Sequence, residues 1–409
     1  MNVFMLLKAE LRRSAAVLAG LALVLALSLS LSIATGLTDR MLRQSSAAAA
    51  DRFDLLIGAK GSSTSLLLST VFLRDEPQTL VPLEVMKGLD DKHGVKWAAP
   101  VAFGDRADAS PIVGTTSTLV TFGGTLKPEE GRAFTNLFEA VVGAETDYKI
   151  GDKIEPMHGR TPGAGHKHSH AHFTVVGRMP ATGTPWDRAV MVPIEALWSM
   201  HSLTLQSKWQ QNTLTLGEWS DEDMKLLPGV SAVVVKPISI ADAYRLRQSQ
   251  STRTVTGQQG EAVNLMGVFS GEVLVSLYGL LGNASEAITL LARLTLITAL
   301  TATVIAGVLL GELRRPSLLQ LRVLGAPRRY LTTLIWLLIM TVIVVGAVGG
   351  LVLGTGFAEG AAILLGRETG IVMHPSPGVD EGMTVVITLI AGAFCALLPA
   401  WLAGRSAIR

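Results

Sequence analysis

Residues 14–38 have the sequence SAAVLAGLALVLALSLSLSIATGLT, which is 25 consecutive residues without a charged side chain. A helix needs about 20 apolar residues to cross the hydrocarbon core of a bilayer. Lys8, Arg12 and Arg13 precede this run, and residues 46–50 (SAAAA) look like a cleavage site, so a cleaved secretory signal is the competing interpretation. Because the apolar core of a signal peptide reaches only about 15 residues, the length favours a retained membrane anchor.

Three further uncharged runs lie in the last third of the chain. They are 18, 28 and 23 residues long and cover Leu294–Gly311, Leu331–Ala358 and Gly382–Gly404. Each approaches or exceeds the length of a membrane span. Hydrophobic residues make up 49% of the chain and charged residues only 17%, which is low for a water-soluble domain. The sequence therefore predicts an α-helical membrane protein with four transmembrane helices.

The charges between the runs predict the orientation. Basic residues dominate three segments: the one before the first run, the one between the second and third runs, and the one after the fourth run. They are Lys8, Arg12, Arg13, Arg314, Arg315, Arg322, Arg328, Arg329, Arg405 and Arg409. The short loop 359–381 instead has one arginine and four carboxylates. Since cytoplasmic loops carry the excess of Lys and Arg, both termini and the loop 312–330 are predicted to be cytoplasmic.

The stretch between the first two runs is long enough for a folded domain, and it mixes strand and helix patterns. Short β-branched segments bounded by glycine and proline predict strands at 95–101, 139–143, 173–177 and 231–235. Segments 79–93 and 238–250 are predicted as helices, and an amphipathic pattern over 264–293 predicts a helical stalk that leads into the second span. The prediction is an α+β extracytoplasmic domain inserted between transmembrane helices 1 and 2.

These predictions divide the chain into seven segments. They are 1–38 (cytoplasmic segment and helix 1), 39–275 (extracytoplasmic domain), 276–311 (stalk and helix 2), 312–330 (cytoplasmic loop), 331–358 (helix 3), 359–381 (extracytoplasmic loop) and 382–409 (helix 4 and tail).

The sequence argues against several classes of function. The net charge of +2 is too small to indicate a nucleic-acid partner. Residues 58–63 (GAKGSS) lack the spacing of a phosphate-binding loop, and neither H-E-x-x-H nor G-x-S-x-G occurs. The single cysteine, Cys395, excludes an intrachain disulfide. We therefore expect a non-catalytic chain that takes any energy it uses from a partner.

The loop between the second and third runs contains a candidate docking element. Residues 312–329 have the sequence ELRRPSLLQLRVLGAPRR, in which leucines recur every third residue. Leu318, Leu321 and Leu324 lie near one face of a short helix with arginines beside them, a pattern suited to a groove on a soluble partner. From spacing alone, an equally good interpretation is that the arginines set topology while the leucines lie against lipid headgroups.

This loop resembles the R-R-x-E-I-x-x-L-R-x-L-G-A-S segment of the MacB/FtsX/LolC-type permeases of ABC transporters, although Pro316 and Ser317 depart from it and the acidic residue is absent. Four other segments are similar to motifs of the same family in the same order: residues 54–61 (DLLIGAKG), 141–154 (V-V-G-A…G-D-K-I), 173–195 (F-T-V-V-G…D-R-A-V-M-V-P-I-E) and 399–405 (PAWLAGR).

The resemblance implies a MacB-like periplasmic core domain and a permease of the bacterial inner membrane, with the large domain in the periplasm. It implies a cytoplasmic ABC ATPase dimer that holds the ATP and Mg²⁺, a second permease chain (identical or not), and a periplasmic or outer-membrane partner. The coupling helix would use Arg314, Arg315, Leu318, Leu321, Arg322, Leu324, Gly325 and Ala326. Lipoprotein or lipid extraction, efflux and metal-linked transport stay open as functions. An FtsX-like regulator of an outer enzyme and a metal-sensing anchor are the alternatives.

Histidines gather in one segment of the predicted outer domain. His166, His168, His170 and His172 alternate along the chain, and His158 precedes them. Alternate residues of an extended segment share a face, and imidazoles bind Zn²⁺, Cu²⁺ or Ni²⁺. Pro162, Gly163 and Gly165 equally favour a solvated insertion without a defined site. We predict modest Zn²⁺ binding in the loop 158–172 and no other cofactor held by this chain.

Overall fold

The computed structural model describes residues 3–90, 93–158, 166–167, 172–200, 216–257 and 260–406. The chain divides into two compact units. The helical unit comprises Met1–Arg43, Leu281–Leu364 and Met373–Arg409, and the sheet unit comprises Gln44–Leu280 and Leu365–Val372. The boundaries between the units fall within three long helices, at residues 43/44, 280/281 and 364/365, so each of these helices contributes residues to both units.

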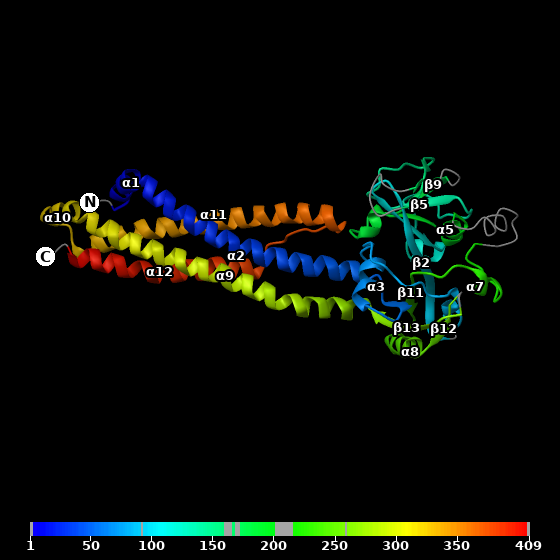
Figure 1. Cartoon of the computed structure of the whole chain (residues 1–409). Coiled ribbons are helices and arrows are strands. Elements are labelled where there is room, and N and C mark those ends of the chain that lie inside the picture. The colour runs from blue at the N-terminus through cyan, green and yellow to red at the C-terminus, as the bar shows by residue number, and fades with distance from the viewer. Residues whose placement is uncertain are drawn as a thin grey trace. The chain divides into compact units, whose positions relative to one another are not determined.

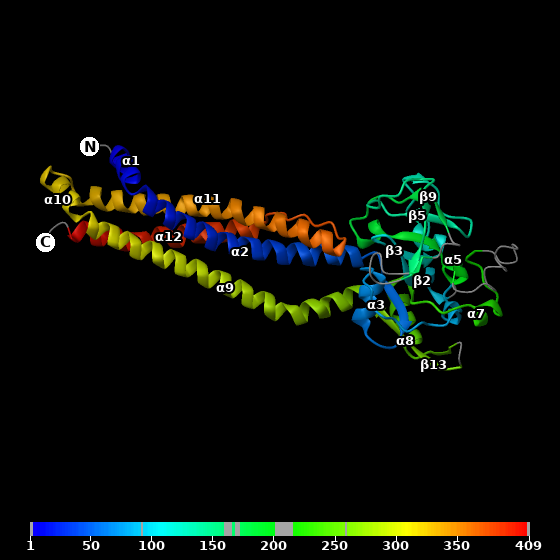
Figure 2. The same cartoon turned by 45° about the horizontal axis from the view of Figure 1, so that its top comes forward.

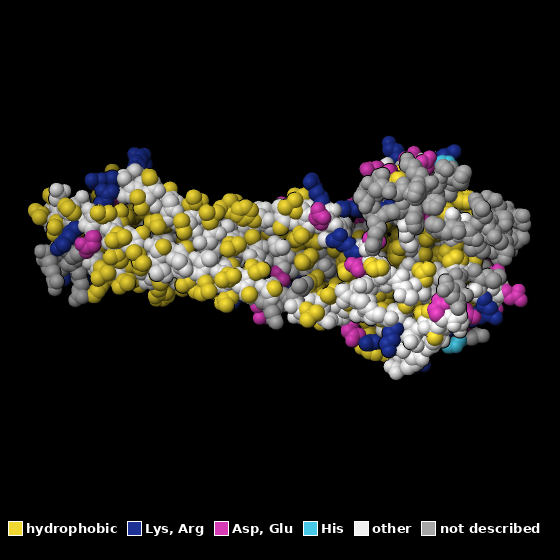
Figure 3. Space-filling view, in the orientation of Figure 1, with side chains coloured by type: hydrophobic (Ala, Val, Ile, Leu, Met, Phe, Trp, Pro, Cys, Tyr) yellow, Lys and Arg dark blue, Asp and Glu magenta, His cyan; other side chains and the backbone are white. Residues whose placement is uncertain are grey.

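The helical unit is built from α1 (Val3–Arg13), α2 (Ala15–Ala50), α9 (Ser270–Leu313), α10 (Arg315–Val323), α11 (Arg328–Thr369) and α12 (Val379–Ser406). Within the described residues, α2, α9, α11 and α12 are long and apolar enough to cross a membrane, which confirms the four predicted apolar helices. They run alongside one another, and α1 and the end of α12 lie at the same end of the unit as α10 (Figures 1 and 2). Hydrophobic side chains cover much of the visible face of this unit (Figure 3).

Three glycines of α11, spaced four residues apart, bring this helix against α2. A Cβ atom added at any of them would come within 2.8 Å of an α2 side-chain atom; the facing pairs are Gly346–Leu25, Gly350–Leu29 and Gly354–Ile33. Small residues at this spacing allow two membrane helices to approach closely and gain dispersion contacts that lipid cannot replace. The α2–α11 pair is therefore a close helix contact along three successive turns.

The sheet unit contains the strands, all of which lie between α2 and α9 in the sequence. They are β1 (Leu55–Ala59), β2 (Val95–Ala107), β3 (Ser110–Thr115), β4 (Glu130–Gly131), β5 (Glu139–Val142), β6 (Lys153–Ile154), β7 (Met157–His158), β8 (His166–Lys167), β9 (Phe173–Arg178), β10 (Val190–Pro193), β11 (Ala232–Pro237), β12 (Thr254–Thr256) and β13 (Ala262–Phe269). The main order is β12-β13-β1-β11-β2-β3-β10-β5-β9-β4, with β6 beside β9, β7 beside β2, and β8 beside β7. The β3–β10 and β5–β9 pairs are parallel and the others antiparallel, so the sheet is mixed.

Both faces of this sheet are buried. Leu55 and Ile57 point into one hydrophobic core, whereas Leu56 between them points into the other. Residues 233–235 of the neighbouring strand β11 repeat the alternation. Burial of such a side chain stabilises the fold by about 1.5–3 kcal/mol. Because both faces are covered, the strands are continuous apolar runs, and the four predicted strands are confirmed as parts of β2, β5, β9 and β11.

The shorter helices of the sheet unit are α3 (Ser63–Thr70), α4 (Ser117–Val120), α5 (Ile194–Met200), α7 (Asp223–Leu226) and α8 (Ile240–Ser251), with 3₁₀ turns η1 (Leu83–Met86) and η3 (Pro185–Arg188). The helix predicted at 238–250 is confirmed by α8. The helix predicted at 79–93 is wrong, because only η1 forms there among the described residues. Pro82 is extended before this turn, and Gly88 follows it with a positive φ of 79°, so both ends interrupt a helix.

The predicted helical stalk begins later than its pattern indicated. Residues 262–269 form β13, which pairs with β1 and β12, and α9 begins only at Ser270. In β13 the alternate residues Val263 and Leu265 are buried in the core, so the apolar spacing of this segment is that of a strand.

Candidate functional sites

The short helix α10 is tied to the first helices of the chain through Arg314. Arg314 Nη2 donates a hydrogen bond to Ser14 Oγ at 2.7 Å, and Arg314 Nε lies 3.6 Å from Glu10 Oε2. Pro316 occupies the first turn of α10, where no backbone N–H is needed. The proline that departs from the family pattern is therefore compatible with a helix here.

The Leu-Gly-Ala sequence after α10 is a helix stop. Ala326 N donates to Leu321 O at 3.0 Å, and Gly325 N donates to Arg322 O at 2.9 Å. Gly325 has a φ of 91°, the left-handed conformation that glycine adopts without strain. These two bonds define a Schellman motif, and Arg322 Nη1 reinforces it by donating to Ala326 O at 3.2 Å.

The leucines of this segment do not share one exposed face, contrary to the expectation from their spacing. Leu318 is 4% exposed and belongs, with the half-buried Leu321, to the core of the helical unit. Leu324 lies at the C-cap and is 78% exposed, and Val323 is 88% exposed. Positions three apart advance by only 300° around a helix, so this row turns from the inner face to the outer one over two steps.

A second candidate site is the loop Thr182–Ala189 of the sheet unit, which we call the attachment loop. Asp187, which is almost fully buried, organises it by accepting hydrogen bonds from the backbone N–H of Thr182 and Gly183 and from Thr182 Oγ1, at 2.6–2.9 Å. Gly143 faces the backbone of Asp187, where a Cβ atom would come within 2.4 Å of the carbonyl. Gly143 of the V-V-G motif therefore packs against Asp187 of the D-R motif.

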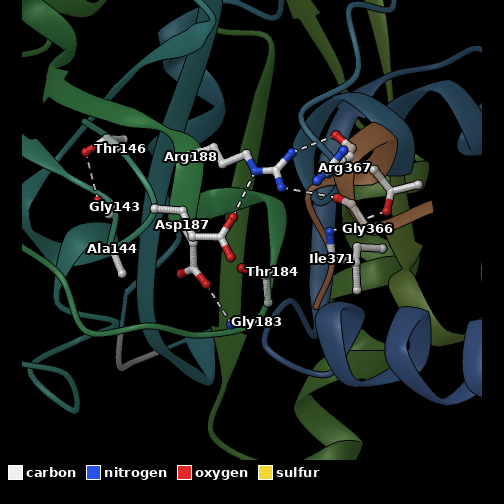
Figure 4. Close-up of polar contacts among 12 residues, drawn as sticks. Gly143, Ala144, Thr146, Gly183, Thr184, Asp187, Arg188, Gly366, Arg367 and Ile371 are labelled. Atoms are coloured by element: carbon white, nitrogen blue, oxygen red, sulfur yellow. Dashed lines mark hydrogen bonds and ion pairs between the residues drawn. The ribbon is translucent and has the colours of Figure 1, made fainter. Parts of the chain in front are cut away.

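Arg188 binds the last residues of α11 (Figure 4). Its Nη1 donates to Arg367 O at 2.8 Å and its Nη2 to Gly366 O at 3.2 Å, while its Nε pairs with Glu145 Oε2 at 2.9 Å. The last carbonyl groups of a helix lack partners within it and carry a partial negative charge. A guanidinium is therefore suited to this position, and Glu145 holds it there.

The chain beyond these carbonyl groups also lies on the attachment loop. Gly370, with a φ of 71°, follows α11, and a Cβ atom added there would come within 3.2 Å of Pro185 Cα. Val372 N then donates to Gly183 O at 3.1 Å. These contacts explain why Leu365–Val372 belongs to the sheet unit.

The attachment loop also contacts the segment that follows α2. Phe53, which is 1% exposed, packs on Trp186 with ring centroids 5.6 Å apart, and Trp186 Nε1 donates to Thr70 O at 3.2 Å. Trp186 and Arg188 are two residues apart in the loop. The same short loop thus contacts both the segment after α2 and the end of α11.

Glu195 is a buried carboxylate at the start of α5. It is 1% exposed, and its Oε1 accepts from Gly217 N at 2.7 Å and from Trp219 Nε1 at 3.1 Å. Removal from water disfavours the charged form and raises the pKa of Glu195 above its ordinary value, although the two hydrogen bonds oppose this effect.

Within the helical unit, an ion pair joins α2 to α12. Arg40 Nη2 lies 2.5 Å from Glu381 Oε1, and Arg40 Nη1 lies 3.3 Å from Asp380 Oδ2. Glu381 is 5% exposed and also accepts from Gly378 N at 2.7 Å. Both carboxylates lie in the first turn of α12, at the end of the acidic segment 359–381 from which the sequence predicted the outer side of the membrane.

The predicted metal ligands fall mostly outside the described part of the chain. His168 and His170 lie outside the described residues, and the backbone of His166 in β8 pairs with that of His158 in β7. His172 is exposed, with its Nδ1 3.8 Å from Glu155 Oε1. Among the described residues no group of three His, Cys, Asp or Glu side chains is placed to hold a metal ion. Zn²⁺ binding by these histidines stays a prediction.

Four apolar helices and a mixed α/β sheet unit inserted after the first of them define a multi-pass membrane protein with one large folded insertion. A family model described as the MacB-like periplasmic core domain matches residues 14–224, which is more than half of the 409 residues. The chain therefore belongs to the MacB/FtsX/LolC-type ABC transporter permeases. A search of curated proteins gave no match.

Proposed function

We propose that this chain is the permease subunit of an ABC system that transmits motion: a separate cytoplasmic ATPase dimer hydrolyses ATP, and the sheet unit moves in response. The observation that carries this proposal is that α2, α9 and α11 each continue into the sheet unit as unbroken helices. A helix conserves its backbone hydrogen bonds along its length and so transmits displacement. The chain itself supplies no nucleotide-binding motif.

The proposed orientation follows the arginine bias. Both termini and α10 would face the cytoplasm of a bacterium, and the sheet unit would face the periplasm. In support, α1 and the end of α12 lie at the same end of the helical unit as α10 (Figure 1), where Lys and Arg side chains gather in Figure 3.

The ATPase would dock on the outer face of α10. Leu319, Val323 and Leu324 are 37%, 88% and 78% exposed, and Val323 lies one helical turn after Leu319. Leu318 and Leu321 would anchor the helix to the bundle, and Arg314 would hold its first turn. Each chain has one α10, so an ATPase dimer requires two permease chains, most simply two copies of this one.

The experiment compares aspartate substitutions at apolar and at polar exposed positions of α10. Val323→Asp with Leu324→Asp should abolish ATPase stimulation and co-purification while the permease still inserts and folds, because a charge opposite an apolar groove costs several kcal/mol. Gln320→Asp, an exposed polar position on the same helix, is the control and should have little effect. Normal co-purification of the Val323/Leu324 variant would remove this face from the mechanism.

An FtsX-like regulator of a periplasmic enzyme would share the ATPase coupling but move no substrate. The two functions separate in reconstituted vesicles: transport or extraction of a lipid or solute in step with ATP hydrolysis supports a transporter, whereas hydrolysis without any flux supports the regulator.

A further inference from the structure

Two adjoining hollows open on the sheet unit beside α4. Their volumes are about 410 Å³ and about 570 Å³, and they share four lining residues, Ser117, Thr118, Phe134 and Thr135. Because the linings overlap, the two hollows adjoin, and we call them together the α4 groove. Its size is within the range of small-molecule sites in proteins.

The walls of the α4 groove combine aromatic rings with hydroxyl groups. Trp97 lines one hollow, Trp219 lines the other, and Phe134 lines both. Hydroxyl side chains of Ser117, Thr118 and other residues lie between them. This composition suits a ligand with an apolar body and a polar group, since aromatic faces bind the former and hydroxyls the latter.

The charges of the α4 groove have one sign. Among the described residues that line it, Glu195 and Glu218 are the charged ones, and no lysine, arginine or histidine contributes. Glu195 is almost fully buried, and the described side of its surroundings gives it two neutral donors, Gly217 N and Trp219 Nε1. A buried carboxylate without a counter-cation is costly, and a cation that enters the groove would offset that cost.

A polar atom of Thr116 in the wall lacks a partner among the described residues. Within the described part of the chain, no hydrogen bond reaches the buried Oγ1 of Thr116, a residue that lines the same hollow as Glu195. A hydroxyl oxygen accepts hydrogen bonds, so an N–H donor in the hollow would satisfy it.

We infer that the α4 groove binds an amphipathic organic amine in its protonated form. The ammonium group would pair with Glu195 and donate to Thr116 Oγ1, and the apolar body would lie against Phe134 and the tryptophans. Cation–π attraction adds to the ion pair where the charge approaches a ring face. This inference rests on the groove alone and does not depend on ATPase coupling.

The experiment titrates the purified full-length chain with 2-phenylethylamine, a cation at neutral pH, and with 2-phenylethanol, which has nearly the same shape but no charge. Binding is measured by calorimetry in the same lipid nanodiscs, with empty nanodiscs to subtract partitioning into lipid. We expect the amine to bind about tenfold or more tightly than the alcohol, which corresponds to about 1.4 kcal/mol.

Three variants then test the assignment. Glu195→Gln should abolish the preference for the amine and leave alcohol binding intact, which also shows that the groove is still folded. Thr116→Val should weaken amine binding severalfold, and Glu272→Gln, which removes an exposed carboxylate of the same unit outside the groove, should change nothing. Equal binding of amine and alcohol by the wild-type chain, or no saturable amine binding, would overturn the inference, as would full amine preference in Glu195→Gln.

Discussion

The guanidinium of Arg188 donates a 2.8 Å hydrogen bond to the backbone carbonyl of Arg367, so a side chain of the sheet unit caps the end of the apolar helix α11. The acceptor is the peptide oxygen of Arg367, so the contact does not involve the side chain of Arg367. The contact lies within the sheet unit, to which residues 365–372 belong.

Replacement of Arg188 by Gln should loosen this attachment. Two bonds to helix carbonyls and the pair with Glu145 are lost, which we estimate to cost about 1 kcal/mol locally because the side chain is more than a third exposed. Hydrogen exchange at residues 366–372 should accelerate severalfold. Arg247→Gln breaks the pair of a similarly exposed arginine with Glu272 and serves as the matched control in the sheet unit. Unchanged exchange in Arg188→Gln would show that the cap is dispensable.

The α2–α11 contact should be sensitive to a single methyl group. Gly350→Ala places a Cβ atom 2.8 Å from Leu29 Cβ, and such overpacking costs about 1–3 kcal/mol. Gly360→Ala adds the same methyl group to the same helix, where no atom lies within 4 Å, and should be neutral or slightly stabilising. Thermal unfolding in detergent distinguishes the two, and equal midpoints would exclude close packing at Gly350.

The Arg40–Glu381 pair should show strong coupling in a double-mutant cycle. Arg40→Gln leaves the buried Glu381 carboxylate without its cation, and loss of one partner of a buried pair costs about 3–5 kcal/mol. The double variant Arg40→Gln/Glu381→Gln has no charge to compensate and should recover much of that loss. Unfolding midpoints of the four proteins give the coupling, and additive effects would show that the pair is not energetically linked.

Glu195 should make stability depend on pH in a defined direction. Burial raises its pKa in the folded chain, so the folded state holds the proton more strongly than the unfolded state. Stability from this group is therefore greatest below the ordinary carboxyl pKa and falls as the pH rises through the raised value. The Glu195→Gln variant has no titrating group at this position. The difference between its unfolding midpoint and that of the wild type should therefore rise with pH. A difference that is constant with pH would contradict the shift.

The histidine segment should bind Zn²⁺ reversibly. Neutral imidazole is the ligand, so affinity should fall steeply below about pH 6.5, and the ordering of a glycine-rich loop should limit it to the micromolar range. Titration of the full chain is compared with a variant in which His166, His168, His170 and His172 are alanine. Wild-type Zn²⁺ affinity in that variant would place the site elsewhere, and lost affinity with normal ATPase coupling would assign the loop no role in transport.

Local patterns in the sequence predicted much of this fold because they have local causes. Uncharged runs predicted the four helices, and β-branched segments such as 231–235 predicted strands whose two faces are both buried. The helix predicted at 79–93 failed because Pro82 and Gly88 outweigh the apolar spacing between them. The start of α9 was misjudged because an alternating strand precedes it without a turn signal.

The contacts between distant segments could not be predicted in the same way. Asp187 and Arg188 belong to a motif that the sequence shows. Nothing nearby in the sequence indicates that Asp187 accepts hydrogen bonds from its own loop or that Arg188 donates to the carbonyl groups of residues 366 and 367. The four-residue spacing of Gly346, Gly350 and Gly354 is a signal that a search for small-residue repeats would have found. The burial of Leu318 depends on where α10 packs, which leucine spacing alone does not determine.

The length of the uncharged run in α11 sets how far this helix can shift through a bilayer. Its 28 residues extend about 42 Å as a helix, whereas the hydrocarbon core is about 30 Å thick. About 12 Å of apolar helix is thus in excess, and the run can tilt or slide by several ångströms before a charge enters lipid. The run of 23 residues in α12 extends only about 35 Å. Displacement along the membrane normal therefore costs less free energy for α11, the helix that Arg188 caps, than for α12.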